Sequence, residues 1–99
     1  MKTNEVVKRL SKELGFPVSD DAIFFYERQG LVPITRNPKN KYRDYTEKEY
    51  VRLGKIFRLS YLGTNLMAIK YLLNVNDIDA KKKWVKLKGT AFRVLKETL

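Results

Sequence analysis

The sequence of 99 residues contains no cysteine and no histidine, and it has only 11 acidic residues against 21 lysines and arginines. Without cysteine the chain cannot form a disulfide, a thiolate zinc site or a thiol nucleophile. Without histidine it lacks the commonest metal ligand and general base of proteins. No paired-carboxylate, glycine-rich or nucleophile motif takes their place. We therefore expect a protein that is not an enzyme and that holds no metal or cofactor.

Long hydrophobic runs are also missing. Every apolar run is far shorter than the roughly 20 residues of a membrane span, and the first ten residues carry too many charges for a signal peptide. The sequence is nonetheless 43% hydrophobic, with six tyrosines, five phenylalanines and one tryptophan, which suffices for one small core. These features predict a soluble, cytoplasmic protein that does not insert into a membrane.

Positive charge is what the sequence has in excess, with a formal net charge of +10. Such an excess on a small body attracts nucleic acid, an acidic membrane face or an acidic protein, and charge alone does not choose among them. The charge is unevenly placed. Residues 18–30 carry one arginine against three carboxylates, whereas residues 81–99 carry seven cations against one carboxylate.

Apolar residues at helical spacing predict four helices in the first three quarters of the chain. They are expected at about 4–14, from Ser19 to Gly30, from Thr46 to Gly63, and from Asn65 to the polar segment 74–77. Candidate N-caps are Thr3 or Asn4, Ser19, Thr46 with Glu49 as a capping box, and Asn65. A fifth, basic amphipathic helix is expected at about 79–97, with three uses left open: dimerisation, packing on the core, or contact with a membrane surface or nucleic acid.

Residues 31–45 have a different pattern, with two prolines, several β-formers and a polar centre. This pattern predicts a β-hairpin with arms at about 32–36 and 41–45 and a basic tip from Arg36 to Lys41. Tyr45 is expected in the core. Two short helices followed by a basic hairpin are typical of a winged helix-turn-helix, so the predicted fold is mainly α with a small β-hairpin and a C-terminal helix.

The stretches VSDDAIFFYERQGLVP, KYRDYTEKEYVRL and KIFRLSYLGTNLMAIKYLL resemble the DNA-binding domain of MerR-family transcriptional regulators, with coverage of residues 3–73. The matching residues are Val18, Ser19, Phe25, Tyr26, Glu27, Arg28, Gly30, Leu31, Arg36, Tyr42, Arg43, Tyr45, Leu62, Gly63, Ile69 and Leu73. The resemblance implies a nucleoid-associated prokaryotic regulator that binds double-stranded DNA. Its second helix would lie in the major groove and its hairpin on the flanking backbone.

The sequence departs from the family pattern at informative places. Residues 21–24 are Asp-Ala-Ile-Phe where the family usually has Arg-Thr-Leu-Arg, and Lys41 stands where the wing normally has glycine. Only about twenty residues follow the fourth helix, and none is cysteine. We therefore expect a DNA-binding domain at 1–75 and a basic helix at 76–99 for packing or homodimerisation, without an effector or metal-sensing domain of its own.

Ten residues are predicted to contact DNA: Ser19, Asp20, Asp21, Phe24, Arg28, Arg36, Lys39, Lys41, Tyr42 and Arg43. The cations and the hydroxyl of the hairpin suit phosphate contacts. Asp20 and Asp21 either accept from a cytosine amino group or only stabilise the helix N-terminus. Phe24 can touch a thymine methyl group, and Arg28 either contacts phosphate or pairs with Glu27.

Two alternatives share the predicted fold. The first is an excisionase-like architectural factor of a mobile element, which bends DNA by binding tandem sites. The second is a protein-binding module, because an acidic and aromatic helix that includes Asp20, Asp21 and Phe24 reads DNA poorly. Oligomeric state and site symmetry distinguish the first from a regulator, and sequence-independent DNA binding that is insensitive to those three residues favours the second.

Overall fold

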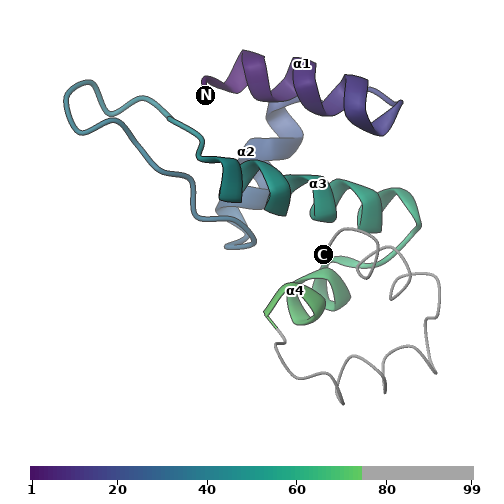
Figure 1. Cartoon of the computed structure of the whole chain (residues 1–99). Coiled ribbons are helices and arrows are strands. Elements are labelled where there is room, and N and C mark those ends of the chain that lie inside the picture. The colour runs from purple at the N-terminus through teal and green to yellow at the C-terminus, as the bar shows by residue number, and fades with distance from the viewer. Residues whose placement is uncertain (75–99) are drawn as a thin grey trace. The chain divides into compact units, whose positions relative to one another are not determined.

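The computed structural model describes residues 1–74, which contain four α-helices (Figure 1). They are α1 (Thr3–Leu14), α2 (Asp20–Arg28), α3 (Glu47–Tyr61) and α4 (Leu66–Asn74). The expected helix at 79–97, and with it the segment 76–99, lies outside the described residues. The chain divides into two compact units, Met1–Gly54 and a second that begins at Lys55. In the described part, no helix has both the length and the apolar character needed to cross a bilayer.

Helix α1 follows the predicted range, but its N-cap does not. Lys2 is the N-cap residue, and its side chain makes no capping hydrogen bond. The predicted Thr3 cap is wrong because the Thr3 hydroxyl instead donates to the hydroxyl of Tyr45 at 3.0 Å. The Asn4 side chain accepts from the adjacent Glu5 amide, which is not a capping arrangement.

Helix α2 begins and ends as predicted. The Ser19 hydroxyl accepts from the amide of Ala22 at 3.1 Å and so caps the first turn. At the other end Gly30 adopts a φ of +75°, which side chains with a Cβ rarely tolerate. The Leu31 amide then donates back to the carbonyl of Tyr26, closing a Schellman turn that reverses the chain into the following loop.

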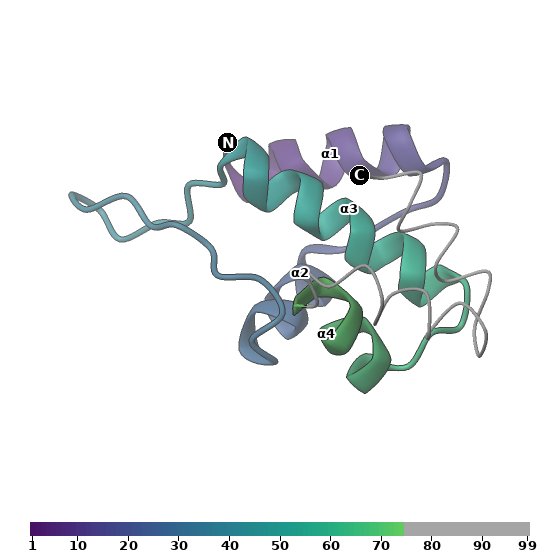
Figure 2. The same cartoon turned by 60° about the horizontal axis from the view of Figure 1, so that its bottom comes forward.

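The first turns of α3 lie along α1, as both views show (Figures 1 and 2). The predicted capping box is confirmed: the Glu49 amide donates to the Thr46 hydroxyl, and the Thr46 amide donates to the Glu49 carboxylate. Arg9 on α1 pairs with Glu47 at 2.6 Å, and the Tyr50 hydroxyl donates to Glu13. Burial and this hydrogen bond raise the pKa of Tyr50 to about 12.

The core of the first unit is apolar and draws on every element. Tyr45, placed in the core by sequence, is only 2% exposed. The buried hydrophobic residues of this unit are Val6, Leu10, Val18, Ile23, Tyr26, Leu31, Val32, Ile34, Tyr45, Tyr50 and Leu53. Because α1, α2 and the start of α3 share this core, it fixes α2 relative to the loop that follows it.

The second unit contains the end of α3 and the whole of α4. Asn65 caps α4 as predicted, since its side-chain oxygen accepts from the Ala68 amide at 2.8 Å. The buried side chains of its described part are Ile56, Phe57, Leu59, Ala68, Ile69 and Leu72. These positions follow the helical spacing seen in the sequence.

Residues 31–46 form a long loop that projects from the helices of the first unit (Figures 1 and 2). The predicted β-hairpin is wrong, because residues 1–74 contain no strand and only one antiparallel bridge, between Arg36 and Arg43. Two hydrogen bonds flank the bridge, from the Asn37 amide to the Tyr42 carbonyl at 2.8 Å and from the Asp44 amide to the Thr35 carbonyl at 2.7 Å.

The bridge does not grow into a ladder because the neighbouring amides are engaged elsewhere. Toward the helices, Pro33 has no amide hydrogen, and the Thr35 amide donates to the carboxylate of Glu49 at 3.1 Å. Toward the tip, the Tyr42 amide donates to the side chain of Asn40 at 3.0 Å. The loop keeps the predicted position and basic tip of a wing without its strands.

Candidate nucleic-acid interface

Residues 31–46, called the wing loop below, are tied to the helices of the first unit at their base. Glu49 of α3 accepts from both the amide and the hydroxyl of Thr35, the latter at 2.6 Å. Arg52, one turn further along α3, donates to the Leu31 carbonyl at 2.6 Å, and burial lowers the pKa of its guanidinium. These contacts fix the point at which the loop leaves the core.

A second set of ties joins the wing loop to α2. The Glu27 carboxylate accepts from the Arg43 guanidinium through Nε at 3.0 Å and Nη2 at 2.9 Å. Its other oxygen lies 3.6 Å from Nη2 of Arg36. The Arg43 guanidinium also lies over the Phe24 ring, 4.0 Å from its centroid. One carboxylate of α2 therefore holds the two arginines that face each other across the loop.

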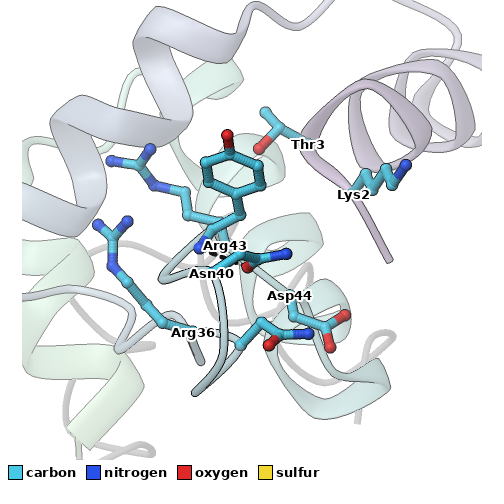
Figure 3. A pocket seen from close by; sticks show the side chains of 8 residues that line it. Lys2, Thr3, Arg36, Asn40, Arg43 and Asp44 are labelled. Carbon is cyan, nitrogen blue, oxygen red and sulfur yellow. Dashed lines mark hydrogen bonds between the residues drawn. The ribbon is translucent and has the colours of Figure 1, made fainter.

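A basic pocket of about 600 Å³ opens beside the wing loop (Figure 3). Lys2, Arg36 and Arg43 supply its positive charge, and Asn37 and Asn40 supply amide groups. Asp44 is the acidic member of the lining. Arg36 and Arg43 extend to the same side of the loop in the close-up, consistent with their shared partner on α2.

The predicted contacts of the loop tip are all at the surface. Lys39 and Lys41 are exposed, and Tyr42 is 73% exposed. Lys41 has a φ of +65°, the backbone conformation that explains why the family prefers glycine at this place. The tip therefore presents two ammonium groups and a phenol hydroxyl, which are suitable donors for phosphate oxygens.

The predicted contacts of α2 are spread from its N-cap to its last turn. Ser19, Asp20 and Phe24 line a second pocket, of about 660 Å³, together with the start of α1. Asp20 and Asp21 are exposed in the first turn, where carboxylates also complement the helix dipole. Arg28 is exposed in the last turn.

Two arginines among the predicted contacts, Arg36 and Arg43, are engaged with other groups of the protein. Arg43 is only 26% exposed, because Glu27 and Phe24 cover its guanidinium. Glu27 was a predicted partner of Arg28, but it pairs with Arg43 and Arg36 instead. Arg36 is 46% exposed and also donates to the Lys41 carbonyl at 3.3 Å.

Sequence reasoning missed Glu27, Glu49 and Arg52 as the residues that hold the wing loop. Glu49 was visible only as a capping-box residue, because its bond to Thr35 spans 14 positions. The pairs Glu27–Arg43 and Arg52–Leu31 span 16 and 21 positions and leave no local pattern. Covariation of opposite charges in related sequences is the signal that can reveal the Glu27–Arg43 pair, whereas Arg52 bonds a backbone carbonyl and gives no such signal.

Two short helices joined by a turn, with a protruding basic loop after the second, define the class of helix-turn-helix DNA-binding proteins. The family model described as MerR HTH family regulatory protein matches residues 6–76, and the chain belongs to this family. The predicted resemblance is thereby confirmed.

Two curated relatives carry regulator names. The chain is 37% identical over 73 residues to the HTH-type transcriptional regulator ZntR homolog of Haemophilus influenzae, covering 74% of this chain and 53% of that protein. It is 38% identical over 65 residues to the mercuric resistance operon regulatory protein of Bacillus cereus, covering 66% and 49%. The chain thus spans about half the length of these curated relatives. No solved structure matches it significantly.

Proposed function

We propose that this chain binds double-stranded DNA as a transcriptional regulator, with α2 in the major groove and the wing loop on the flanking backbone. The observation that carries the proposal is the tie between these two elements. Glu27 on α2 holds Arg36 and Arg43 of the loop, so the helix and the loop present one surface. A helix in the major groove and a loop on the flanking backbone must be held at a fixed distance from each other to contact adjacent parts of one duplex.

The proposed surface comprises the predicted residues Ser19, Asp20, Asp21, Phe24, Arg28, Arg36, Lys39, Lys41, Tyr42 and Arg43. Lys39 and Lys41 are proposed to contact phosphates, since they lie exposed at the tip of a projecting loop. Asp20 and Asp21 are proposed to face base edges, where a carboxylate accepts from the amino group of cytosine. The proposal concerns the described DNA-binding part and leaves the expected homodimer and the expected lack of an effector domain as separate predictions.

The proposal is tested by fluorescence anisotropy with a labelled duplex of random sequence over a series of salt concentrations. Wild-type protein should bind at low salt and lose affinity steeply as salt rises, because each phosphate contact adds about 0.9 to the logarithmic salt slope. Lys39→Ala should weaken binding and lower the slope by about 0.9. Lys12→Ala removes the same charge from the last turn of α1 and serves as the matched control, with the slope unchanged. No duplex affinity at low salt would end the proposal.

Selection of bound duplexes from a random pool then tests how sequence is read. A regulator should select an inverted repeat and bind it as a dimer, whereas cooperative loading of monomers on direct repeats would identify the architectural factor. Substitution of Asp20 and Asp21 by alanine should change the selected sequence. An unchanged selection would remove these two residues from base recognition.

A protein-binding role is the second candidate. It is favoured by one observation: the first turn of α2 exposes two carboxylates, and Arg43 covers one face of the Phe24 ring, which leaves this helix less suited to a DNA groove than the wing loop. DNA binding without sequence preference, unaffected by alanine at Asp20, Asp21 and Phe24, would support this candidate over sequence-specific regulation.

A further inference from the structure

Glu27 contacts Arg43 and Arg36 differently, although both arginines are predicted to contact phosphate. Arg43 gives two N–H groups to Glu27 at 2.9 and 3.0 Å and stacks on Phe24, which leaves 26% of its side chain exposed. Arg36 lies 3.6 Å from the same carboxylate and is 46% exposed. A phosphate can therefore reach Arg36 without breaking a short hydrogen bond, whereas it reaches Arg43 only in competition with Glu27 and Phe24.

The position of Glu27 on α2, beside both arginines of the wing loop, gives this carboxylate a second effect. Arg36 and Arg43 form the antiparallel bridge, so two positive side chains face each other across the loop. Like charges at directly opposite positions repel and favour separation of the two chain segments. Glu27 lies against both arginines and offsets this repulsion, so the bridge depends on a residue of α2.

From this geometry we propose that Glu27 and Arg43 are positioning residues for DNA binding: they set the wing loop against α2, and Arg43 makes no phosphate contact itself. The phosphate contacts of the wing loop are then made by Arg36, Lys39 and Lys41. The inference rests on the proposed DNA-binding function. Simple electrostatics predicts that removing the negative charge of Glu27 strengthens binding to a polyanion. The positioning role predicts the opposite, that the removal weakens binding.

The decisive comparison uses Glu27→Gln and Glu47→Gln in the full chain. Both substitutions remove one negative charge, and both break an arginine–glutamate pair, but Glu47 pairs with Arg9 of α1 rather than with the wing loop. With the random-sequence duplex, Glu27→Gln should weaken binding by about tenfold, the size expected for coupled residues in contact. Glu47→Gln should leave binding equal or tighter. Tighter binding by both variants would overturn the proposal.

Arg43 is tested by a charge-preserving substitution. Arg43→Lys keeps the charge that a phosphate contact needs but loses the paired N–H groups and the planar stack. We expect Arg43→Lys and Arg43→Ala to weaken binding by a similar factor, about tenfold, with the salt slope of wild type in both. Binding by Arg43→Lys close to that of wild type, with a reduced slope in Arg43→Ala, would make Arg43 a phosphate contact and refute the proposal.

A measurement without DNA separates this inference from the proposed function. Hydrogen exchange of the Asn37 and Asp44 amides, which donate across the loop, reports how well the bridge is held. Exchange should speed up in Glu27→Gln and stay unchanged in Glu47→Gln. Failure of wild-type protein to bind duplex DNA would refute the proposed function, whereas unchanged exchange in Glu27→Gln would refute the positioning role even if wild type binds DNA.

Discussion

Replacing Glu49 by alanine should lower the free energy of unfolding by about 2 kcal/mol. The Glu49 carboxylate accepts from the Thr46 amide as part of the capping box and from the amide and hydroxyl of Thr35 in the wing loop. The substitution removes the bond from the Thr46 amide and the bonds from Thr35, which at a solvent-accessible acceptor are together worth about 2 kcal/mol, while the Thr46 hydroxyl still accepts from the amide of residue 49. One side chain thus stabilises both the start of α3 and the base of the wing loop.

The assay is urea unfolding followed by circular dichroism, with Glu47→Ala as the matched control. Glu47 is also a glutamate in the first turn of α3, but its ion pair with Arg9 is exposed to solvent and should contribute much less. In a thermal unfolding experiment followed in the same way, Glu49→Ala should lower the melting temperature by about 10 °C. It should also speed exchange of the Thr35 amide, which Glu47→Ala should not change.

Equal destabilisation by the two alanine substitutions would refute the reasoning. Such a result would mean that the first-turn charge of α3, which both glutamates share, accounts for the whole effect. Normal protection of the Thr35 amide in Glu49→Ala would specifically contradict the anchoring of the wing loop.

Two further predictions concern alkaline pH and the loop tip. Because the folded state raises the pKa of Tyr50 from 10.0 to about 12, the stability that Tyr50 contributes is present below pH 10 and is lost as the pH rises toward 12. The difference in unfolding free energy between wild type and Tyr50→Phe should therefore shrink over this interval, and a constant difference would contradict the assignment. Lys41→Gly should stabilise the protein by about 1 kcal/mol, since glycine adopts the positive φ at this position without strain. Lys39→Gly, which removes the same charge from the same tip, should give no such gain in thermal unfolding.

The elements that could be predicted from sequence are those fixed by neighbours in the chain. Ser19, the Thr46–Glu49 pair and Asn65 act as caps over three residues, so their patterns were sufficient. The turn at Gly30 followed for the same reason. Local chemistry therefore gave the helices of residues 1–74 to within a few residues.

The errors occurred where distant residues take over a local group. Thr3 has the side chain of a helix cap, but Tyr45 engages its hydroxyl from 42 positions away. The β-formers of residues 32–45 favour strands, but the Thr35 amide donates to the Glu49 carboxylate instead of to the opposite segment of the loop. The bonds of Arg43 to Glu27 were missed for the same reason, because the two residues lie 16 positions apart. Such competition depends on the assembled core, which no local pattern encodes.

The two ends of α2 have different freedom to change. The last turn is bound to the wing loop through Glu27, whereas the first turn exposes Asp20 and Asp21 and is capped by the Ser19 hydroxyl. Substitutions at positions 20 and 21 can therefore accumulate without disturbing the attachment of the loop. Under the proposed function, randomising these two positions should change the DNA sequence that α2 selects, while the attachment of the wing loop to α2 stays the same.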